Sequence, residues 1–166
     1  MQDIISRLRA KKDDEGFTLI ELLVVVVIIG VLVAIAVPVY LNYREGAADK
    51  SAQSDVRGAI SAIEQFYSKN GNKYPDSIFG ANDGSSTGKE ALPLQLAPDP
   101  EDGTITLSEN TSLGYVLDPA GSGASTYLIC AQNDGGTDNV WYLYDSSKGG
   151  SVKEIKSTTM GTDDCS

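Results

Sequence analysis

The sequence predicts an α+β protein, in which one long N-terminal helix packs against a C-terminal antiparallel sheet of three to four strands. Two observations carry this prediction. From residue 17 the chain is apolar for most of 24 residues, and apolar residues then continue at helical spacing to about residue 70. From residue 113 onward, short β-prone runs alternate with turns rich in Gly, Asp and Ser.

Composition narrows the class of protein. The 166 residues include 13 basic and 23 acidic ones, which gives a net charge of −10, and there is no histidine. An acidic surface repels phosphates, so we expect no direct contact with nucleic acid. Histidine is the usual general base and metal ligand at neutral pH. Since the sequence shows no nucleophile–base pair or phosphate-binding loop either, we expect a protein that is not an enzyme and needs no cofactor.

A polar segment precedes the apolar one, which suggests a membrane topology. In a helix, residues 17–40 span about 36 Å, enough to cross a hydrocarbon core of about 30 Å. Basic residues before a span favour a cytoplasmic N-terminus. We therefore expect a polar leader (1–16), a transmembrane helix (17–40) and an outward-facing head (41–166). The basic residues of the leader are Arg7, Arg9, Lys11 and Lys12.

Two ordinary interpretations account for the length of the apolar segment. It can be a secretory signal peptide, because Ala34-Ile35-Ala36 supplies a small-x-small cleavage site that would release a soluble binding domain. It can also be a plain membrane anchor. Neither interpretation gives a reason for Glu21, since a carboxylate deep in an apolar span costs at least about 2–3 kcal/mol. Near the interface the cost is smaller, so the plain anchor stays open as an alternative.

The residues around Glu21 offer a third interpretation. The stretch Gly16-Phe17-Thr18-Leu19-Ile20-Glu21-Leu22-Leu23 resembles the type III signal of type IV pilins and type II secretion pseudopilins. The resemblance implies that prepilin peptidase cuts after Gly16 and that the new N-terminal Phe17 is methylated. It also implies that Glu21 pairs with the N-terminal amine of a neighbouring subunit. This leader departs from the family's usual pattern in having three acidic residues, 13–15, directly before the cut.

The resemblance further implies a pilin fold and a structural function. The chain would form a homo-oligomeric filament through its N-terminal helix, assembled by an inner-membrane platform with a separate ATPase. It would lie in membrane lipid before assembly, and afterwards in an extracellular pilus or a periplasmic or cell-wall filament. The sequence does not distinguish a major pilin from a minor pilin or a pseudopilin. Gly30 and Pro38 match family positions where the helix can loosen, although an ordinary helix kink is the alternative.

Beyond Pro38 the helix is expected to bury one apolar stripe and to end at Asn70-Gly71. Residues 71–111 are rich in turn-forming residues and are expected to be a long loop with at most a short helix, used for contacts between subunits. The stripe comprises Ala48, Ala52, Val56, Ala59, Ile60, Ile63, Phe66 and Tyr67. The expected strands are Leu113–Leu117, Tyr127–Ala131, Val140–Asp145 and an edge at Val152–Ile155.

The last third of the chain contains two further candidate features. Cys130 and Cys165 are expected to form one disulfide that closes a loop of about 36 residues, worth roughly 3–4 kcal/mol; two unrelated buried thiols are the alternative. In the oxygen-rich loop 133–139, Asp134 and Asp138 are calcium candidates. The spacing does not match a defined calcium loop, so plain turn residues are the alternative there.

Overall fold

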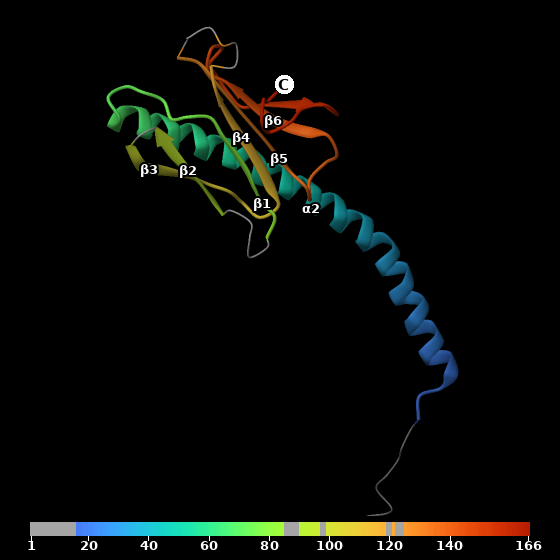
Figure 1. Ribbon diagram of the computed structural model, residues 1–166. Coiled ribbons are helices and arrows are strands. Elements are labelled where there is room, and N and C mark those ends of the chain that lie inside the picture. The colour runs from blue at the N-terminus through green and yellow to red at the C-terminus, as the bar shows by residue number, and fades with distance from the viewer. Residues whose placement is uncertain (1–15, 85–89, 97–98, 119–120, 122–124) are drawn as a thin grey trace, which may run out of the picture. The chain divides into compact units, whose positions relative to one another are not determined.

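The computed structural model describes residues 16–84, 90–96, 99–118, 121 and 125–166 (Figure 1). The chain divides into two compact units, Met1–Leu41 and Asn42–Ser166, and each is described by itself. The second unit is called the head below. The helix α2 (Leu19–Lys69) contributes its first residues to the first unit and the remainder to the head.

The helix ends where the sequence predicts. The backbone and side-chain N–H groups of Asn70 both donate to the carbonyl of Phe66 at 3.0 Å, which satisfies one of the last free carbonyls of the helix. Gly71 and Asn72 then adopt positive φ values of 62° and 60°. Glycine and asparagine tolerate this left-handed backbone best, so the chain leaves the helix here.

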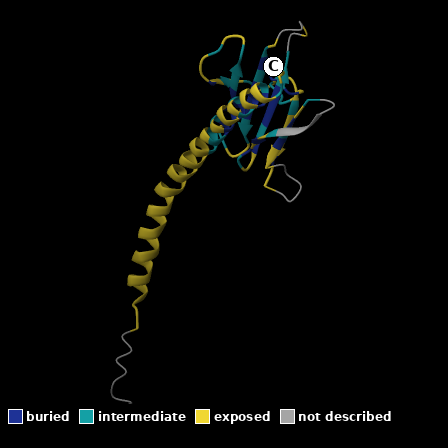
Figure 2. Cartoon of the chain, turned by 90° about the vertical axis from the view of Figure 1, so that its left-hand side faces the viewer, coloured by how far each residue is buried: buried dark blue, intermediate teal, exposed yellow. Residues whose placement is uncertain are grey.

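One face of α2 within the head forms the centre of the core, as the apolar stripe predicts. Ala52, Val56, Ala59, Ile63 and Phe66 are all buried and belong to one apolar cluster with residues of the strands. Figure 2 shows buried residues in the strands and in the helix turns beside them. The predicted helix stripe and its packing against a sheet are therefore confirmed.

The principal sheet has five antiparallel strands in the order β1-β4-β5-β6-β7. The meander of four strands that the sequence predicts is confirmed as β4 to β7, and β1 adds a fifth strand beside β4. The bounds are β1 Ile78–Asn82, β4 Thr111–Leu117, β5 Tyr127–Asn133, β6 Val140–Asp145 and β7 Lys153–Lys156.

The prediction for residues 71–111 was wrong, because this segment contains three strands rather than a loop. Besides β1, it forms a separate two-stranded antiparallel sheet from β2 (Ala91–Leu96) and β3 (Asp99–Thr106). Leu92, Leu94 and Ile105 of this hairpin are buried in the same core as the helix stripe. Burying these apolar side chains stabilises the extended backbone despite the many turn-forming residues nearby.

The two faces of the five-stranded sheet bury different clusters. Side chains alternate along each strand, so Leu113, Tyr115 and Ile129 join the helix core while Cys130 and Trp141 point to the opposite face. There the last residues of the chain, 157–166, pack over the sheet; we call them the C-terminal strap. Cys165 of the strap forms the predicted disulfide with Cys130, with Cα atoms 5.5 Å apart. The alternative of two free thiols is excluded.

Candidate functional site

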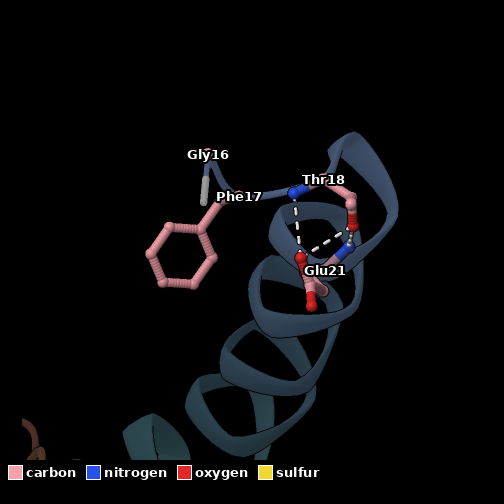
Figure 3. A pocket seen from close by; sticks show the side chains of 4 residues that line it. All are labelled: Gly16, Phe17, Thr18 and Glu21. Carbon is pink, nitrogen blue, oxygen red and sulfur yellow. Dashed lines mark hydrogen bonds between the residues drawn. The ribbon is translucent and has the colours of Figure 1, made fainter. Parts of the chain in front are cut away.

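The N-terminus of α2 is capped by reciprocal hydrogen bonds between Thr18 and Glu21 (Figure 3). The backbone N–H and the hydroxyl of Thr18 both donate to Oε2 of Glu21 at 2.8 Å, and the N–H of Glu21 donates to the Thr18 hydroxyl at 3.3 Å. Thr18 directly precedes the helix and Glu21 is its third residue, so the pair is a capping box. The carboxylate also lies at the positive end of the helix dipole, which favours its charge.

The two residues before this cap are exposed and non-helical. Gly16 and Phe17 have no regular secondary structure, and the Phe17 side chain projects away from the helix into solvent (Figure 3). Exposed, irregular backbone is the form that peptidases cleave most readily. The other predicted leader residues, including its basic and acidic side chains, lie outside the described residues.

The helix of the first unit carries an unpaired apolar surface. From Phe17 to Leu41 every residue is exposed (Figure 2), and the stretch is long and apolar enough to cross a membrane. Soluble monomeric proteins rarely expose a continuous apolar patch of this extent, so lipid or other protein must cover it. The helix continues through Gly30 and Pro38 without a break. Whether either residue loosens it in an assembly stays a prediction.

Comparison with known proteins identifies this combination of features. A family model described as the prokaryotic N-terminal methylation motif matches residues 11–37, which include the cap and much of the apolar helix. Type II secretion system core protein G of Escherichia coli (strain K12) is 33% identical over 130 residues, covering 77% of this chain and 88% of that protein. This chain belongs to the type IV pilin and type II secretion pseudopilin family.

Pilins proper are also among the relatives. Type IV major pilin protein PilE1 of Neisseria gonorrhoeae is 33% identical over 102 residues, and PilE of the same species is 33% identical over 100 residues. These matches cover 59% of this chain and 54% and 58% of the two pilins, so the chain spans somewhat more than half of their length. No solved structure matches the chain.

Within this pilin-family head, the calcium candidates lie on a loop with another role. Asp134 and Asp138 are exposed in the turn between β5 and β6. The same loop binds the helix, because the N–H and hydroxyl of Thr137 donate to the carboxylate of Asp49 at 3.0 and 2.7 Å. The described part of the chain brings together no group of three or more His, Cys, Asp or Glu side chains that could hold a metal. These contacts support a structural role for the loop, and calcium binding by Asp134 and Asp138 stays a prediction.

Sequence reasoning missed two carboxylates that join the helix to the strands. Asp55 is buried, and both the N–H and the hydroxyl of Ser108 donate to it at 2.8 and 2.9 Å. Glu64 accepts a 2.6 Å hydrogen bond from the buried hydroxyl of Tyr127. The signal for Asp55 was present in the sequence, since it stands three residues after Ala52 and four before Ala59 and therefore lies on the apolar face.

Proposed function

We propose that the chain is a structural subunit of a type IV pilus or a related secretion filament, processed by prepilin peptidase and polymerised through its N-terminal helix. One observation carries the proposal. An exposed, non-helical Gly16-Phe17 segment, a capped Glu21 and an exposed apolar helix follow one another within the first unit, in a chain of the pilin and pseudopilin family. The proposed parts are the leader (1–16), the transmembrane and polymerisation helix (17–40) and the head (41–166).

The geometry supports a specific role for cleavage. Hydrolysis of the Gly16–Phe17 peptide bond leaves Phe17 with a free amine, which is then methylated and remains cationic. Both capping bonds from Thr18 reach Oε2 of Glu21, so Oε1 is available to the ammonium of a neighbouring subunit. An ammonium and a carboxylate attract strongly in a low-dielectric environment, and either one alone is penalised there. Pairing with Phe17 would therefore set the register between subunits.

The exposed apolar surface of the helix is consistent with a covering of lipid before assembly and of neighbouring subunits after it. Before assembly we infer a single-pass membrane precursor with a cytoplasmic N-terminus, as the four basic residues of its leader favour. In the filament, extracellular or within the cell envelope, helices of neighbouring copies would cover one another. We assign the chain no catalytic role: a separate ATPase and an inner-membrane platform would drive assembly. Residues 71–111 and the region of the Cys130–Cys165 disulfide would contact neighbouring heads.

The secreted-domain alternative fits the observations less well. Cleavage after Ala36 would cut α2 in the middle of an unbroken helix that extends from Leu19 to Lys69. It would also discard the cap formed by Thr18 and Glu21 and most of the residues that match the methylation motif.

Mass spectrometry of the N-terminal peptide from membrane and sheared surface fractions tests the proposed processing. We expect a mature chain that starts at Phe17 and carries one added methyl group. A chain that starts at Val37 would instead indicate a released domain, and an intact leader would indicate a static anchor. Either result would overturn the proposal.

A further inference from the structure

Two exposed tyrosines and an arginine stand where the uncharged part of α2 ends. Tyr40 is 60% exposed and Tyr43 is 76% exposed, and the exposed Arg44 follows directly. Tyr43 and Arg44 are consecutive, and Tyr40 precedes them in the sequence by three and four residues. We call these three residues the tyrosine–arginine girdle.

Among the described residues, the apolar clusters of the head include no residue of the girdle. The other tyrosines of the head are packed within it. Tyr142 is buried, and five more form a series of ring contacts with centroids 4.4 to 5.9 Å apart: Tyr67, Tyr74, Tyr115, Tyr127 and Tyr144. Asp49, an acid close to Arg44 in sequence, is engaged by Thr137. Arg44 has no ion pair among the residues that the structure describes. The chain therefore leaves two large amphipathic side chains and a cation exposed on a single helix.

The position of the girdle matches a bilayer boundary. No charged residue stands between Glu21 and Arg44, and the 22–43 stretch rises about 33 Å as a helix. A hydrocarbon core is about 30 Å thick. When Arg44 lies at one headgroup layer, Glu21 with its Thr18 cap therefore reaches the opposite one.

We propose that the tyrosine–arginine girdle binds phospholipid headgroups of the leaflet on the head side while the chain is an unassembled precursor. This inference rests on the proposed membrane-inserted state. The apolar rings of Tyr40 and Tyr43 pack among the upper acyl chains and their hydroxyls hydrogen-bond in the headgroup layer. The guanidinium of Arg44 binds lipid phosphate in a bidentate manner, and its apolar stem extends along the helix.

A consequence concerns Glu21. With the girdle fixed at one boundary, the Glu21 carboxylate stays at the other boundary and avoids the cost of an acid deep in hydrocarbon. It enters a low-dielectric environment only when the subunit leaves the lipid, at which point a neighbouring Phe17 ammonium becomes its partner. While the girdle is bound to headgroups, Glu21 therefore stays at the opposite bilayer boundary, and it leaves that boundary only when the girdle leaves the lipid.

Depth-dependent fluorescence quenching tests the girdle in the full chain. Tyr43→Trp and, as a mid-span reference, Val31→Trp are reconstituted in phosphatidylcholine vesicles with bromines at shallow or deep acyl positions. Each signal is read as the difference from the wild-type chain, whose native Trp141 is buried in the head. We expect the tryptophan at position 43 to be quenched most by shallow bromines and that at position 31 by deep bromines.

A second pair of variants tests whether binding of Arg44 to headgroups, rather than the length of the apolar helix alone, determines the depth of residue 43. Added to Tyr43→Trp, Arg44→Leu removes the phosphate contact, so we expect the quenching maximum to shift toward deeper bromines. Lys50→Leu, an exposed cation further along the same helix, is the matched control and should cause no shift.

The outcomes distinguish this inference from the proposed function. The inference is overturned if the Val31→Trp chain is quenched but the tryptophan at position 43 is either unquenched or quenched most by deep bromines. It is also overturned if Arg44→Leu and Lys50→Leu behave alike. Absence of quenching at position 31 would instead remove the membrane span, and with it the proposed precursor.

Discussion

Three carboxylates along α2 determine how the helix is joined to the rest of the head. Asp49 accepts hydrogen bonds from the β5–β6 loop, Asp55 from the segment that follows β3, and Glu64 from Tyr127 at the start of β5. Each acid therefore joins the helix to a segment far away in the sequence. A buried polar group without a partner is costly, so these bonds specify where the helix lies along the strands.

Asp55 offers the clearest test of this arrangement. Asp55→Ala leaves the N–H of Ser108 without its acceptor in a partly buried site, which should lower the free energy of unfolding by about 1–3 kcal/mol. Urea unfolding of the detergent-solubilised chain, followed by circular dichroism, measures this loss. Ser54→Ala changes the exposed neighbour and should stay within about 0.5 kcal/mol of wild type. Equal midpoints for the two variants would contradict the assigned role of Asp55.

The raised pKa of Tyr127 predicts how the free energy of unfolding of the head changes at alkaline pH. Burial, and secondarily the hydrogen bond to Glu64, raise the pKa of Tyr127 far above its ordinary value. The unfolded chain thus loses a proton near pH 10 that the folded chain keeps, so the contribution is complete below about pH 10 and declines as pH rises. Each such group removes about 1.4 kcal/mol per pH unit in that range.

Tyr127→Phe should therefore make stability fall less steeply above about pH 10, by about 1.4 kcal/mol per pH unit. Urea midpoints at a series of alkaline pH values measure the slope. Tyr115→Phe should act in the same direction, because burial also raises the pKa of Tyr115. A slope unchanged in both variants would show that these hydroxyls titrate in the folded head.

At the scale of elements, the C-terminal strap depends on the pairing of β4 with β5. Gly114 stands opposite Cys130 in the sheet, and the strap lies directly over both residues. The strap carbonyl of Thr162 occupies the space that any side chain at position 114 would need. A slip by one residue would turn Cys130 to the other face of the sheet, so the disulfide requires the correct register.

Gly114→Ala tests the docking of the strap. The added methyl group meets the backbone of Thr162, which cannot rotate aside as a side chain would, so we expect a loss of about 1–3 kcal/mol. Gly58→Ala is a matched control in open space on α2, where alanine should stabilise the helix by about 0.5–1 kcal/mol. Denaturant unfolding under oxidising conditions measures both. An unchanged midpoint for Gly114→Ala would contradict the close packing of the strap.

Periodicity predicted most elements of the head but missed β1 and the β2–β3 hairpin. The helix stripe and the four C-terminal strands are long or strongly patterned, so their residue spacing alone identified them. Residues 71–111 contain an alternating pattern too, in Leu92, Leu94 and Leu96, but Pro93 interrupts it and turn-forming residues surround it. Proline is tolerated there because β2 pairs only with β3 and is an edge strand.

Part of the candidate site could be predicted from the sequence. The family motif identified Gly16, Phe17 and Glu21, but the role of Thr18 needed the hydrogen bonds that form the cap. The pairings of Asp49 with Thr137 and of Glu64 with Tyr127 could not be predicted, because each joins residues more than sixty positions apart. Such pairings are fixed by the packing of the whole head and leave no local pattern.

At the scale of the whole molecule, the two units meet different requirements. The head buries an apolar core of its own, and its C-terminal strap packs on the sheet. None of the buried side-chain N or O atoms among the described residues lacks a hydrogen-bond partner. The first unit leaves its apolar helix uncovered. A chain of this kind is stable in lipid or in an assembly of copies, which is the basis of the proposed filament subunit.

The central claim is that neighbouring copies polymerise through this helix with Glu21 setting their register. Its most direct test quantifies the chain in sheared filaments and in membranes of cells that produce wild type or Glu21→Gln, with the processed N-terminus verified in both fractions. We predict that wild type enters filaments and that Glu21→Gln, which keeps the helix but loses the charge, is processed yet stays in the membrane. Equal incorporation of the two chains, or no wild-type chain in filaments, would contradict the account.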